Sequence, residues 1–496
     1  MTLATADIAP DTKAIPGPIS LWVGVVTYAL LIVDGNRLLL DPDTMWQIAV
    51  GQWIIDHHAV PHTDIYSFTM RGTPWISTQW LAQVLYAEVY AWLGWTGPVA
   101  LAAAGIASAF ALFARFLNRY LRDSTTLVFV VAVWWITLPH QLARPHVLAF
   151  PLLVVWIGGL IDAADRRAAP PFYLAVLMAL WANLHGGFVF GLFFIVPAAL
   201  DALVNAEPAA RRALALRWAA FALLALAASC CTPYGWDALL ASEKILSLGS
   251  ALPLIVEWKP ADFGSVGPFE VCLLLGIGLA LFHGLRLPPM RILMLIGLLH
   301  MAFAQGRAAE ILGLVGPLVL AAPIARQIGG AVTRDAGTAR PSRLMLAGLV
   351  LTLFAGTMAS VSLRSFAPNM RGTPVAAVAY LKTLHLTRVF NDYDFGGYLI
   401  ASGVAPFIDG RTELYGEKFF VDHNNASGLM EPENLFRLLD EYQIEATLMR
   451  TQSAATKLLD HMDGWQKIYS DDVATIHLRK AVGMHTAEPA GESNAK

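Results

Sequence analysis

Long apolar runs alternate with short polar segments along most of the chain, and this pattern predicts membrane-spanning helices. A run of roughly 17–25 apolar residues is long enough to cross the hydrocarbon of a bilayer. We expect about 11 transmembrane helices, near residues 19–40, 98–117, 124–139, 146–163, 171–184, 187–205, 213–231, 267–285, 291–305, 309–325 and 344–363. The first of them is expected to remain as an anchor, because residues 1–18 do not read as a cleavable signal.

Basic residues fall in alternate loops between these runs, and cytoplasmic loops carry an excess of Lys and Arg. We therefore expect the following residues to be cytoplasmic: Arg115, Arg119, Arg122, Arg166, Arg167, Arg211, Arg212, Arg217, Arg286, Arg291, Arg326, Arg334, Arg340 and Arg343. The other loops, including 41–80 and 232–266, would face outward and carry nearly all the chemically interesting residues. Segment 77–95 would invert this order if it crossed, so we interpret it as an interfacial helix; an ordinary crossing is the alternative.

The pattern changes after the last span, since charges become frequent and apolar runs short from about residue 364 to 482. This stretch reads as a soluble α/β domain, and an odd number of crossings places it outside. We expect helices at 375–384, 435–442 and 454–462, and strands at 388–391, 406–409, 446–449 and 473–478. The domains expected are a transmembrane domain over 1–363, including the outer loop 41–80, the α/β domain over 364–482, and a disordered tail over 483–496.

Composition agrees with this division and excludes other classes. The chain is 56% hydrophobic and only 14% charged over 496 residues, which cannot form one soluble core with a polar shell. The net charge of −3 gives no general attraction to nucleic acid, so we expect no nucleic-acid partner. The cysteines, Cys230, Cys231 and Cys272, do not indicate a disulfide framework.

Two carboxylates, Asp41 and Asp43, stand where the first apolar run ends and a loop rich in Trp and Tyr begins. Acids beside a bilayer are costly unless they have a role. Residues 44–56 show apolar positions at helical spacing, so we expect a short amphipathic helix resting on the bilayer. Capping of that helix would explain one of the acids. It would not explain the pair together with His62 and Asp64.

This loop resembles the first outer loop of bacterial polytopic glycosyltransferases of the GT-C type. In that family the loop reads D-x-D-x-W-(H/Q) … G-x-W-I … H-x-x-x-P-H-x-D-x-(F/Y)-S-(F/Y)-T … G-x-x-W … (E/Q)-W-L. The matching positions here are Asp41, Asp43, Trp46, Gln47, Gly51, Trp53, Ile54, His57 or His58, Pro61, His62, Asp64, Tyr66, Ser67, Phe68, Thr69, Gly72, Trp75, Gln79, Trp80 and Leu81.

The resemblance extends over most of the chain. It continues through Ala143-Arg144-Pro145-His146, Leu180-Trp181-Ala182-Asn183-Leu184-His185-Gly186-Gly187, Thr232-Pro233-Tyr234-Gly235, Glu257-Trp258, Val389-Phe390-Asn391-Asp392, Gly396-Gly397-Tyr398 and Ile408-Asp409-Gly410-Arg411. It implies a GT-C like fold and the transfer of a sugar, with inversion, from a polyprenyl-phosphate carrier to a glycan, lipid or protein acceptor. The implied location is the bacterial inner membrane, with membrane lipids as further partners.

The residues can be assigned roles in that chemistry. A general base must lie within hydrogen-bond reach of the acceptor hydroxyl, and Asp41 or Asp43 would serve. A guanidinium holds two phosphate oxygens at once, which suits Arg144 or Arg307. The full set of candidate substrate-binding residues is His62, Asp64, Gln79, Arg144, His146, His185 and Arg307.

Structural explanations compete for several of these residues. His185 could be a packed, hydrogen-bonded histidine at a helix end, and Arg144 could anchor an interfacial turn by snorkelling. Asp409-Gly410-Arg411 is interpreted as a turn closed by a local ion pair, and Gly396-Gly397 as a tight turn. The tryptophans of the first loop are interpreted mainly as interfacial anchors.

The sequence departs from the family pattern at Gln47, where His is common, and at Gln79, where Glu is common. Each change removes a possible metal ligand. No cofactor is certain from the sequence and the metal ligands are unknown, although a divalent cation remains open. We therefore favour acid/base catalysis over metal chelation for the Asp pair.

Two other functions remain open. A transporter or flippase for lipid-linked saccharides would also have many spans and a few membrane-level charges, but its essential charges should lie in mid-span. A non-catalytic assembly factor for envelope polysaccharide would use the α/β domain for docking, and its first-loop acids would be dispensable.

Overall fold

The computed structural model describes residues 18–328, 343–368 and 372–480, which form two compact units. The first unit comprises the described residues of Met1–Leu39, Thr78–Ser242 and Leu252–Phe366. The second comprises those of Leu40–Ser77, Glu243–Ala251 and Ala367–Lys496. The tail expected over 483–496 lies outside the described residues.

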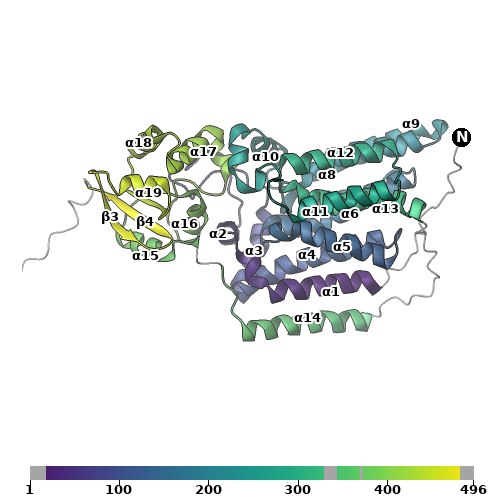
Figure 1. Cartoon of the computed structure of the whole chain (residues 1–496), viewed down its shortest axis with the longest axis horizontal. Coiled ribbons are helices and arrows are strands. Elements are labelled where there is room, and N and C mark those ends of the chain that lie inside the picture. Colours follow the sequence, from purple (N-terminus) through teal and green to yellow (C-terminus); the bar gives the residue numbers. More distant parts are fainter. Residues whose placement is uncertain (1–17, 329–342, 369–371, 481–496) are drawn as a thin grey trace, which may run out of the picture. The chain divides into compact units, whose positions relative to one another are not determined.

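The first unit is helical, and each of the predicted spans falls on helix (Figure 1). Its elements are α1 (Pro18–Val33), η1 (Gly35–Leu39), α3 (Trp80–Leu93), α4 (Thr96–Leu117), α5 (Asp123–Thr137), η2 (Leu138–His140), α6 (Pro145–Asp165), α7 (Leu174–Leu184), α8 (Phe188–Asn205), α9 (Pro208–Ser229), η4 (Val256–Trp258), α11 (Pro268–Phe282), α12 (Pro289–Ala304), α13 (Ala308–Ile328) and α14 (Arg343–Leu363). Helix α10 (Asp237–Leu246) and η3 (Gly249–Leu254) lead the chain into and out of segment 243–251.

Five of the described helices, α4, α6, α8, α9 and α13, have at least 18 residues and are apolar enough to cross a membrane. Shorter apolar helices occur in α1, α7, α11, α12 and α14. The prediction of a multi-pass membrane protein is therefore confirmed. Helices α6 and α13 lie deepest in the unit, since 78% of each apolar window is buried, against 33% in α9.

Close packing between central helices depends on small residues. A Cβ at Gly105 of α4 would lie 2.9 Å from the carbonyl oxygen of Val147 in α6. The two backbones thus approach more closely than a side chain would allow, as is common where helices associate in membranes.

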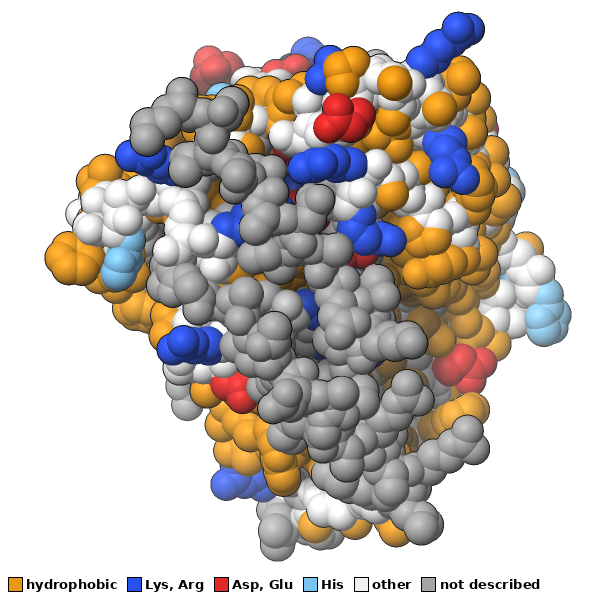
Figure 2. Space-filling view, turned by 90° about the vertical axis from the view of Figure 1, so that its right-hand side faces the viewer, with side chains coloured by type: hydrophobic (Ala, Val, Ile, Leu, Met, Phe, Trp, Pro, Cys, Tyr) orange, Lys and Arg blue, Asp and Glu red, His pale blue; other side chains and the backbone are white. Residues whose placement is uncertain are grey.

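One end of the first unit collects charged side chains near helix ends. Figure 2 looks onto such an end, where Lys and Arg side chains lie among apolar ones. Arg119 and Arg166 both pair with Asp162, at 2.6 and 2.9 Å. Arg291, the third residue of α12, is buried and pairs with Asp165 and Asp201, both at 2.8 Å.

Helix α3 covers most of the segment predicted to be interfacial. Its 14 residues span about 21 Å at 1.5 Å per residue, which is shorter than a hydrocarbon core of about 30 Å. It packs against α4, α6 and α7 of the same unit. The interfacial placement of 77–95 stays a prediction.

The second unit contains a four-stranded mixed sheet with the order β1-β2-β4-β3, in which β1 and β2 are parallel and the other pairs antiparallel. Its elements are α2 (Asp43–His57), α15 (Val375–Thr383), β1 (Val389–Asn391), η6 (Tyr393–Phe395), α16 (Gly396–Ala401), α17 (Thr412–Gly428), α18 (Pro432–Glu441), β2 (Ala446–Arg450), α19 (Ala454–Leu459), β3 (Trp465–Ser470) and β4 (Ala474–Arg479). The predicted α/β domain is confirmed. Its core joins α15, α16 and the inner strands through residues such as Val378, Leu399 and Leu448.

Residues 406–409 do not form the expected strand, although Phe407 and Ile408 are buried. Their backbone groups bond to a side chain, since Phe407 N–H donates to Asn391 Oδ1 at 2.7 Å and Asn391 Nδ2 donates to the Ile408 carbonyl at 2.9 Å. The first loop supplies further bonds, because Phe68 N–H donates to the Pro406 carbonyl. An apolar run with such partners needs no neighbouring strand.

The first outer loop packs with the C-terminal residues, whereas the sequence-based division placed it in the transmembrane domain. Helix α2 lies against α16, where a Cβ at Gly397 would be 2.9 Å from the Pro42 carbonyl oxygen. Gly396 has ordinary helical angles, φ −54° and ψ −41°, so these glycines permit close approach rather than a tight turn. Segment 243–251 joins the same unit through Ser250, whose N–H and hydroxyl donate to Glu417 at 2.7 and 2.6 Å.

Candidate functional site

In the first unit, two of the predicted arginines converge on one carboxylate. Arg144 stands at the N-cap of α6 and Arg307 directly precedes α13. Arg144 Nη1 donates to Glu257 Oε1, and Arg307 Nη1 donates to Glu257 Oε2 at 2.7 Å. Each guanidinium therefore holds one oxygen of the same oxyanion. Side-chain exposures of 15–21% leave the cluster partly open.

Backbone hydrogen bonds fix the loop that carries Glu257. Arg307 N–H donates to the Glu257 carbonyl at 3.1 Å, and Gly306 N–H donates to the Lys259 carbonyl at 2.7 Å. Ala261 N–H donates to the Phe303 carbonyl at 3.0 Å. These hydrogen bonds join residues 257–261 to residues 303–307 at the turn between α12 and α13. They thereby hold the Glu257 carboxylate beside both arginines.

Three histidines lie in the same part of the unit. His146 Nε2 donates to the His140 carbonyl at 3.0 Å, and the rings of His146 and His185 have centroids 6.2 Å apart. His185 Nδ1 accepts the Gly187 N–H at 3.0 Å, in agreement with a packed histidine at a helix end.

Burial, together with the charges of Arg307 and Arg144, lowers the pKa of His140 to about 4 and that of His185 to about 3. These histidines are therefore neutral near pH 7. The positive charge of the cluster comes from the arginines, which stay protonated.

Some buried polar atoms near the arginines have no hydrogen-bond partner among the described residues. They include Nδ1 of His146 and Oε2 of Glu310, whose residues are 4% and 3% exposed. Arg307 Nε lies 3.7 Å from Glu310 Oε1. Buried polar groups are normally satisfied, so unsatisfied ones beside partly exposed arginines suit a place where a polar ligand binds.

In the second unit, the two first-loop acids stand at the start of α2. Asp41 Oδ1 accepts the N–H of Asp43 at 2.7 Å, and Asp43 Oδ1 accepts Trp46 Nε1–H at 3.0 Å. Asp41 thus accepts the backbone N–H of the first residue of α2, whereas Asp43, for which capping was the competing explanation, accepts the Trp46 indole instead. Asp43 is held by a neighbouring indole, and both residues are partly exposed.

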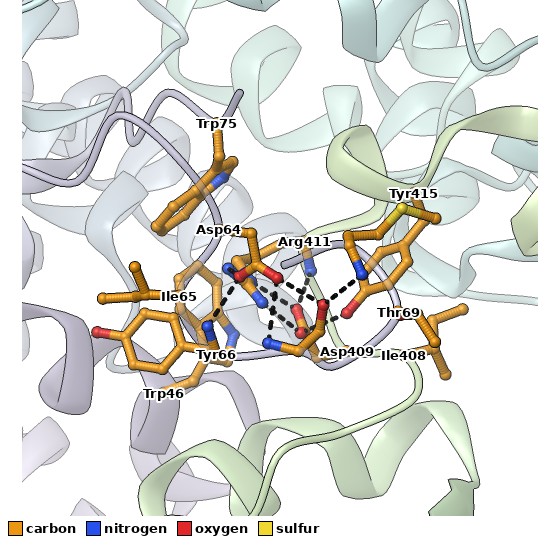
Figure 3. Close-up of polar contacts among 12 residues, drawn as sticks. Trp46, Asp64, Ile65, Tyr66, Thr69, Trp75, Ile408, Asp409, Arg411 and Tyr415 are labelled. Atoms are coloured by element: carbon orange, nitrogen blue, oxygen red, sulfur yellow. Dashed lines mark hydrogen bonds and ion pairs between the residues drawn. The ribbon is translucent and has the colours of Figure 1, made fainter. Parts of the chain in front are cut away.

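Asp64 belongs to a buried charge network with the C-terminal domain, which Figure 3 shows in close-up. Arg411 Nη1 donates to Asp64 Oδ1 at 2.6 Å, while its Nε and Nη2 donate to Asp409 at 2.8 and 2.6 Å. Asp64 also accepts hydrogen bonds from Tyr66 N–H and from the N–H and hydroxyl of Ser67. All three charged side chains of this network are 0% exposed.

The local ion pair expected in Asp409-Gly410-Arg411 is therefore present, and it extends to Asp64, 347 residues away in the chain. Burial alone would lower the pKa of Arg411, but the carboxylates of Asp409 and Asp64 raise it well above its ordinary value. With both of its oxygens already engaged and no exposure, Asp64 fits a structural role better than the predicted contact with substrate.

Two of the four first-loop tryptophans, Trp46 and Trp75, are covered by protein, which differs from the expectation of interfacial anchors, while Trp53 and Trp80 are partly exposed. Trp46 and Trp75 are each 3% exposed. Trp75 stacks over Arg411 at 4.7 Å and donates its N–H to Glu413 at 3.3 Å. In the first unit, Trp80 donates to Asn183 Oδ1 at 2.8 Å. Apolar residues at helical spacing predict that their side chains are buried. They do not predict whether lipid or other protein segments cover them.

The structure therefore separates the predicted site residues into two groups. The first unit contains Gln79, Arg144, His146, His185 and Arg307, and the second contains Asp41, Asp43, His62 and Asp64. Gln79 is the N-cap of α3 and His62 is exposed, with its carbonyl accepting Trp75 N–H. The sequence analysis did not include Glu257 among the candidate site residues. The signal that could have identified it is the Glu257-Trp258 pair, which belongs to the resemblance to the glycosyltransferase family.

A metal site does not emerge from the described part of the chain, where no three His, Cys, Asp or Glu side chains are placed to hold one ion. In addition, one oxygen of Asp43 is engaged by Trp46. The divalent cation left open by the sequence thus gains no support from the donor set of the described residues. All three cysteines are free.

A helical unit with apolar spans, joined to an α/β domain that carries the first outer loop, defines a class of multi-pass membrane protein. Its fold is that of the GT-C glycosyltransferases, as the solved structures it resembles show. No protein-family model and no curated protein sequence matches the chain.

Two solved structures share the fold over 87% of this chain. One is the archaeal oligosaccharyltransferase AglB from Archaeoglobus fulgidus, in complex with an inhibitory peptide and a dolichol phosphate, with 11% identity, 69% of that chain covered and a TM-score of 0.53. The other is an Archaeoglobus fulgidus oligosaccharyltransferase in the apo form, with 12% identity, 70% covered and a TM-score of 0.52. ArnT from Cupriavidus metallidurans, bound to undecaprenyl phosphate, aligns with a TM-score of 0.47 at 12% identity, covering 95% of this chain and 98% of its own. The predicted GT-C like fold is confirmed.

Proposed function

We propose that the protein is a membrane glycosyltransferase that transfers a sugar, with inversion, from a polyprenyl-phosphate carrier to an envelope acceptor. The observation that carries this proposal is the convergence of Arg144 and Arg307 on the two oxygens of one carboxylate. Two guanidiniums so arranged suit a phosphate, which presents more oxygens than a carboxylate does. The fold supports the proposal, since a structure that shares it holds dolichol phosphate.

The chemistry requires two kinds of group. A carboxylate takes the proton of the acceptor hydroxyl as its oxygen attacks C1 of the sugar, and Asp41 or Asp43 is proposed for this step. The C1–O bond to the carrier breaks at the same time, leaving the electron pair on the lipid phosphate. Arg144 and Arg307 stabilise the charge that develops there.

The remaining candidates have supporting roles. His146 and His185 are proposed to orient the phosphate or sugar hydroxyls as neutral donors or acceptors. His62 and Gln79 remain proposals for contact with substrate. The acceptor is a glycan, lipid or protein, and the α/β domain is proposed to lie on the periplasmic side of the bacterial inner membrane.

The transporter alternative receives less support from the charge distribution. The buried ion pairs of Arg291 lie near helix ends, with Asp165 the last residue of α6 and Asp201 close to the end of α8. A substrate pathway would favour charges near the middle of spans. A non-catalytic assembly factor is distinguished by experiment.

The test uses the purified full chain in nanodiscs with a panel of polyprenyl-phosphate sugars. We expect sugar transfer or donor hydrolysis by the wild type and its loss in Asp41→Asn or Asp43→Asn. A chelator should change the rate little, given Gln47 and Gln79. If the wild type shows no turnover on a broad panel while both variants still support the cellular phenotype, the enzyme proposal is wrong.

A further inference from the structure

The start of α2 rests on glycines of the C-terminal residues. A Cβ at Gly397 would lie 2.9 Å from the Pro42 carbonyl oxygen and 3.2 Å from Trp46 Cδ1. A Cβ at Gly410 would overlap Asp43 Oδ1 and lie 3.2 Å from its Cγ. The carboxylate of Asp43 therefore occupies the space that any side chain at position 410 would need.

Trp46 also holds the carboxylate of Asp43, through the same oxygen. Its Nε1–H donates to Asp43 Oδ1 at 3.0 Å, and a Cβ at Gly410 would lie 3.3 Å from the same nitrogen. The indole is 3% exposed, so its position is set by packing. Asp41 is linked to this arrangement, because its Oδ1 accepts the N–H of Asp43.

The turn that carries Gly410 is itself held rigidly. Asp409 and Arg411 form the buried network with Asp64, and the Ile408 carbonyl accepts Asn391 Nδ2–H at 2.9 Å. Gly396 lets this turn approach α16, since a Cβ there would lie 2.5 Å from Asp409 Cα. These contacts all lie within the second unit, and Figure 3 shows Asp409 and Arg411 of the turn beside Asp64.

We propose that Gly410, with Gly397 and Trp46, is a positioning element for the first-loop acids. The C-terminal domain then acts on the reaction by fixing Asp41 and Asp43, beyond any recognition of the acceptor. This inference rests on the proposed glycosyltransferase function. A small displacement of a catalytic group is costly, since a misplacement of about 1 Å can lower the rate about 100-fold.

Gly410→Ala is the direct test, because its Cβ would push against the flexible end of Asp43 rather than against backbone. We expect kcat for sugar transfer to fall about tenfold or more, with KM for the lipid donor unchanged. The matched control is Gly464→Ala in the same unit, where a Cβ would meet nothing within 4 Å. Gly464→Ala should keep the wild-type kcat.

Trp46→Phe is the second test, since it keeps an aromatic side chain but removes the N–H that Asp43 accepts. Loss of a donor makes the ionised carboxylate less favourable, so the acid limb of the pH profile of kcat should move to higher pH. A loss of folded protein alone would lower the rate at every pH and leave the limb in place. An unchanged limb would contradict a positioning role for Trp46.

A disulfide cross-link tests the contact between positions 43 and 410 independently of enzyme activity. In a background with Cys230, Cys231 and Cys272 replaced by Ala, Asp43→Cys and Gly410→Cys together should form a disulfide under mild oxidation, because the two positions are close enough for one. Absence of the cross-link overturns the inference by itself. A cross-link with full activity in Gly410→Ala overturns positioning while the proposed function stands. A cross-link with no turnover by the wild type on the broad panel, while Asp41→Asn and Asp43→Asn still support the cellular phenotype, overturns both.

Discussion

The Arg411 cluster of the second unit and the Arg144–Arg307 cluster of the first are both built from arginines and carboxylates, yet they differ in exposure. The side chains of Arg411, Asp64 and Asp409 are 0% exposed. Those of Arg144, Arg307 and Glu257 are 15–21% exposed, and buried polar atoms beside them lack described partners.

This difference in exposure indicates which of the two clusters can exchange a carboxylate partner for a ligand. A fully buried guanidinium between two carboxylates, each accepting further donors, gains nothing from a ligand and loses much if a partner leaves. A partly exposed pair of arginines that shares one carboxylate can replace it with another oxyanion at a lower desolvation cost. Presence of arginines alone would not separate the structural cluster from the candidate binding cluster.

The strongest test of this comparison is Arg411→Met. Removal of one partner from a buried ion pair costs about 3–5 kcal/mol, so the second unit should unfold at markedly lower denaturant concentration. Arg437→Met is the control, because Arg437 is 42% exposed in its pairs with Asp422 and Glu441 and surface pairs contribute about 0–1 kcal/mol. Equal loss in both variants would contradict a structural role specific to Arg411.

Arg144→Ala and Arg307→Ala should affect turnover instead. Loss of one group that stabilises developing charge typically costs about 10²–10³ in rate, and we expect losses of this order in kcat/KM for the lipid donor. The measurement is the initial rate of sugar transfer, with folding checked by thermal unfolding. Wild-type rates in both variants would exclude these arginines from the phosphate site.

The second unit should also lose stability in mild acid. Burial, partly offset by the hydrogen bond to the Asn391 carbonyl, lowers the pKa of His423 to about 4. Since the unfolded chain takes up a proton near pH 6.5 and the folded chain does not, stability falls as pH drops from about 6.5 to 4, by about 3 kcal/mol.

The check for His423 is unfolding of the wild type and of His423→Gln as a function of pH. Glutamine retains a donor for the Asn391 carbonyl but does not titrate, so the slope between pH 6.5 and 4 should become shallower. An unchanged slope would assign the acid sensitivity to other groups, such as His477, whose pKa burial also lowers.

The smallest expected effect concerns Glu257. Glu257→Gln keeps the shape of the side chain but removes the charge that competes with a phosphate for both arginines. The affinity for a polyprenyl phosphate should increase about two- to fivefold. The effect is small because the ion pairs of Glu257 with Arg144 and Arg307 are partly exposed to solvent and therefore screened. Titration with the uncharged polyprenol is the control, and weaker phosphate binding would mean that Glu257 organises the arginines.

Much of the helical unit could be predicted because its signal is local. An apolar run of sufficient length predicts a membrane-spanning helix without knowledge of its neighbours. The segments near 146–163 and 309–325 are observed as the buried helices α6 and α13. The strand at 446–449 was likewise readable from its short, mostly apolar run, and the structure buries all four residues. The strand β3 was missed, because only one of the six residues of Trp465–Ser470 is buried and the segment shows no clear alternation.

Other features depend on contacts that no local pattern contains. The buried run at 406–409 reads as a strand, yet the Asn391 side chain and the first loop take its backbone bonds. Trp46 and Trp75 read as interfacial residues, although protein covers them. For the candidate site, the sequence indicated Arg144 and Arg307 separately, and Glu257 joins them only in the folded chain.

The sequence by itself determined that this is a multi-pass membrane protein with a C-terminal α/β domain, because hydrophobic length and charge density act residue by residue. It also supplied the acids and arginines of the proposed chemistry. Only the tertiary structure decided that Asp64 is sealed in an ion pair with Arg411, 347 residues away, and that Asp43 lies against Gly410. The physical reason is that burial and ion pairing depend on which distant segments come into contact. The sequence shows that a residue is charged, but not whether its charge stabilises the fold or binds a ligand.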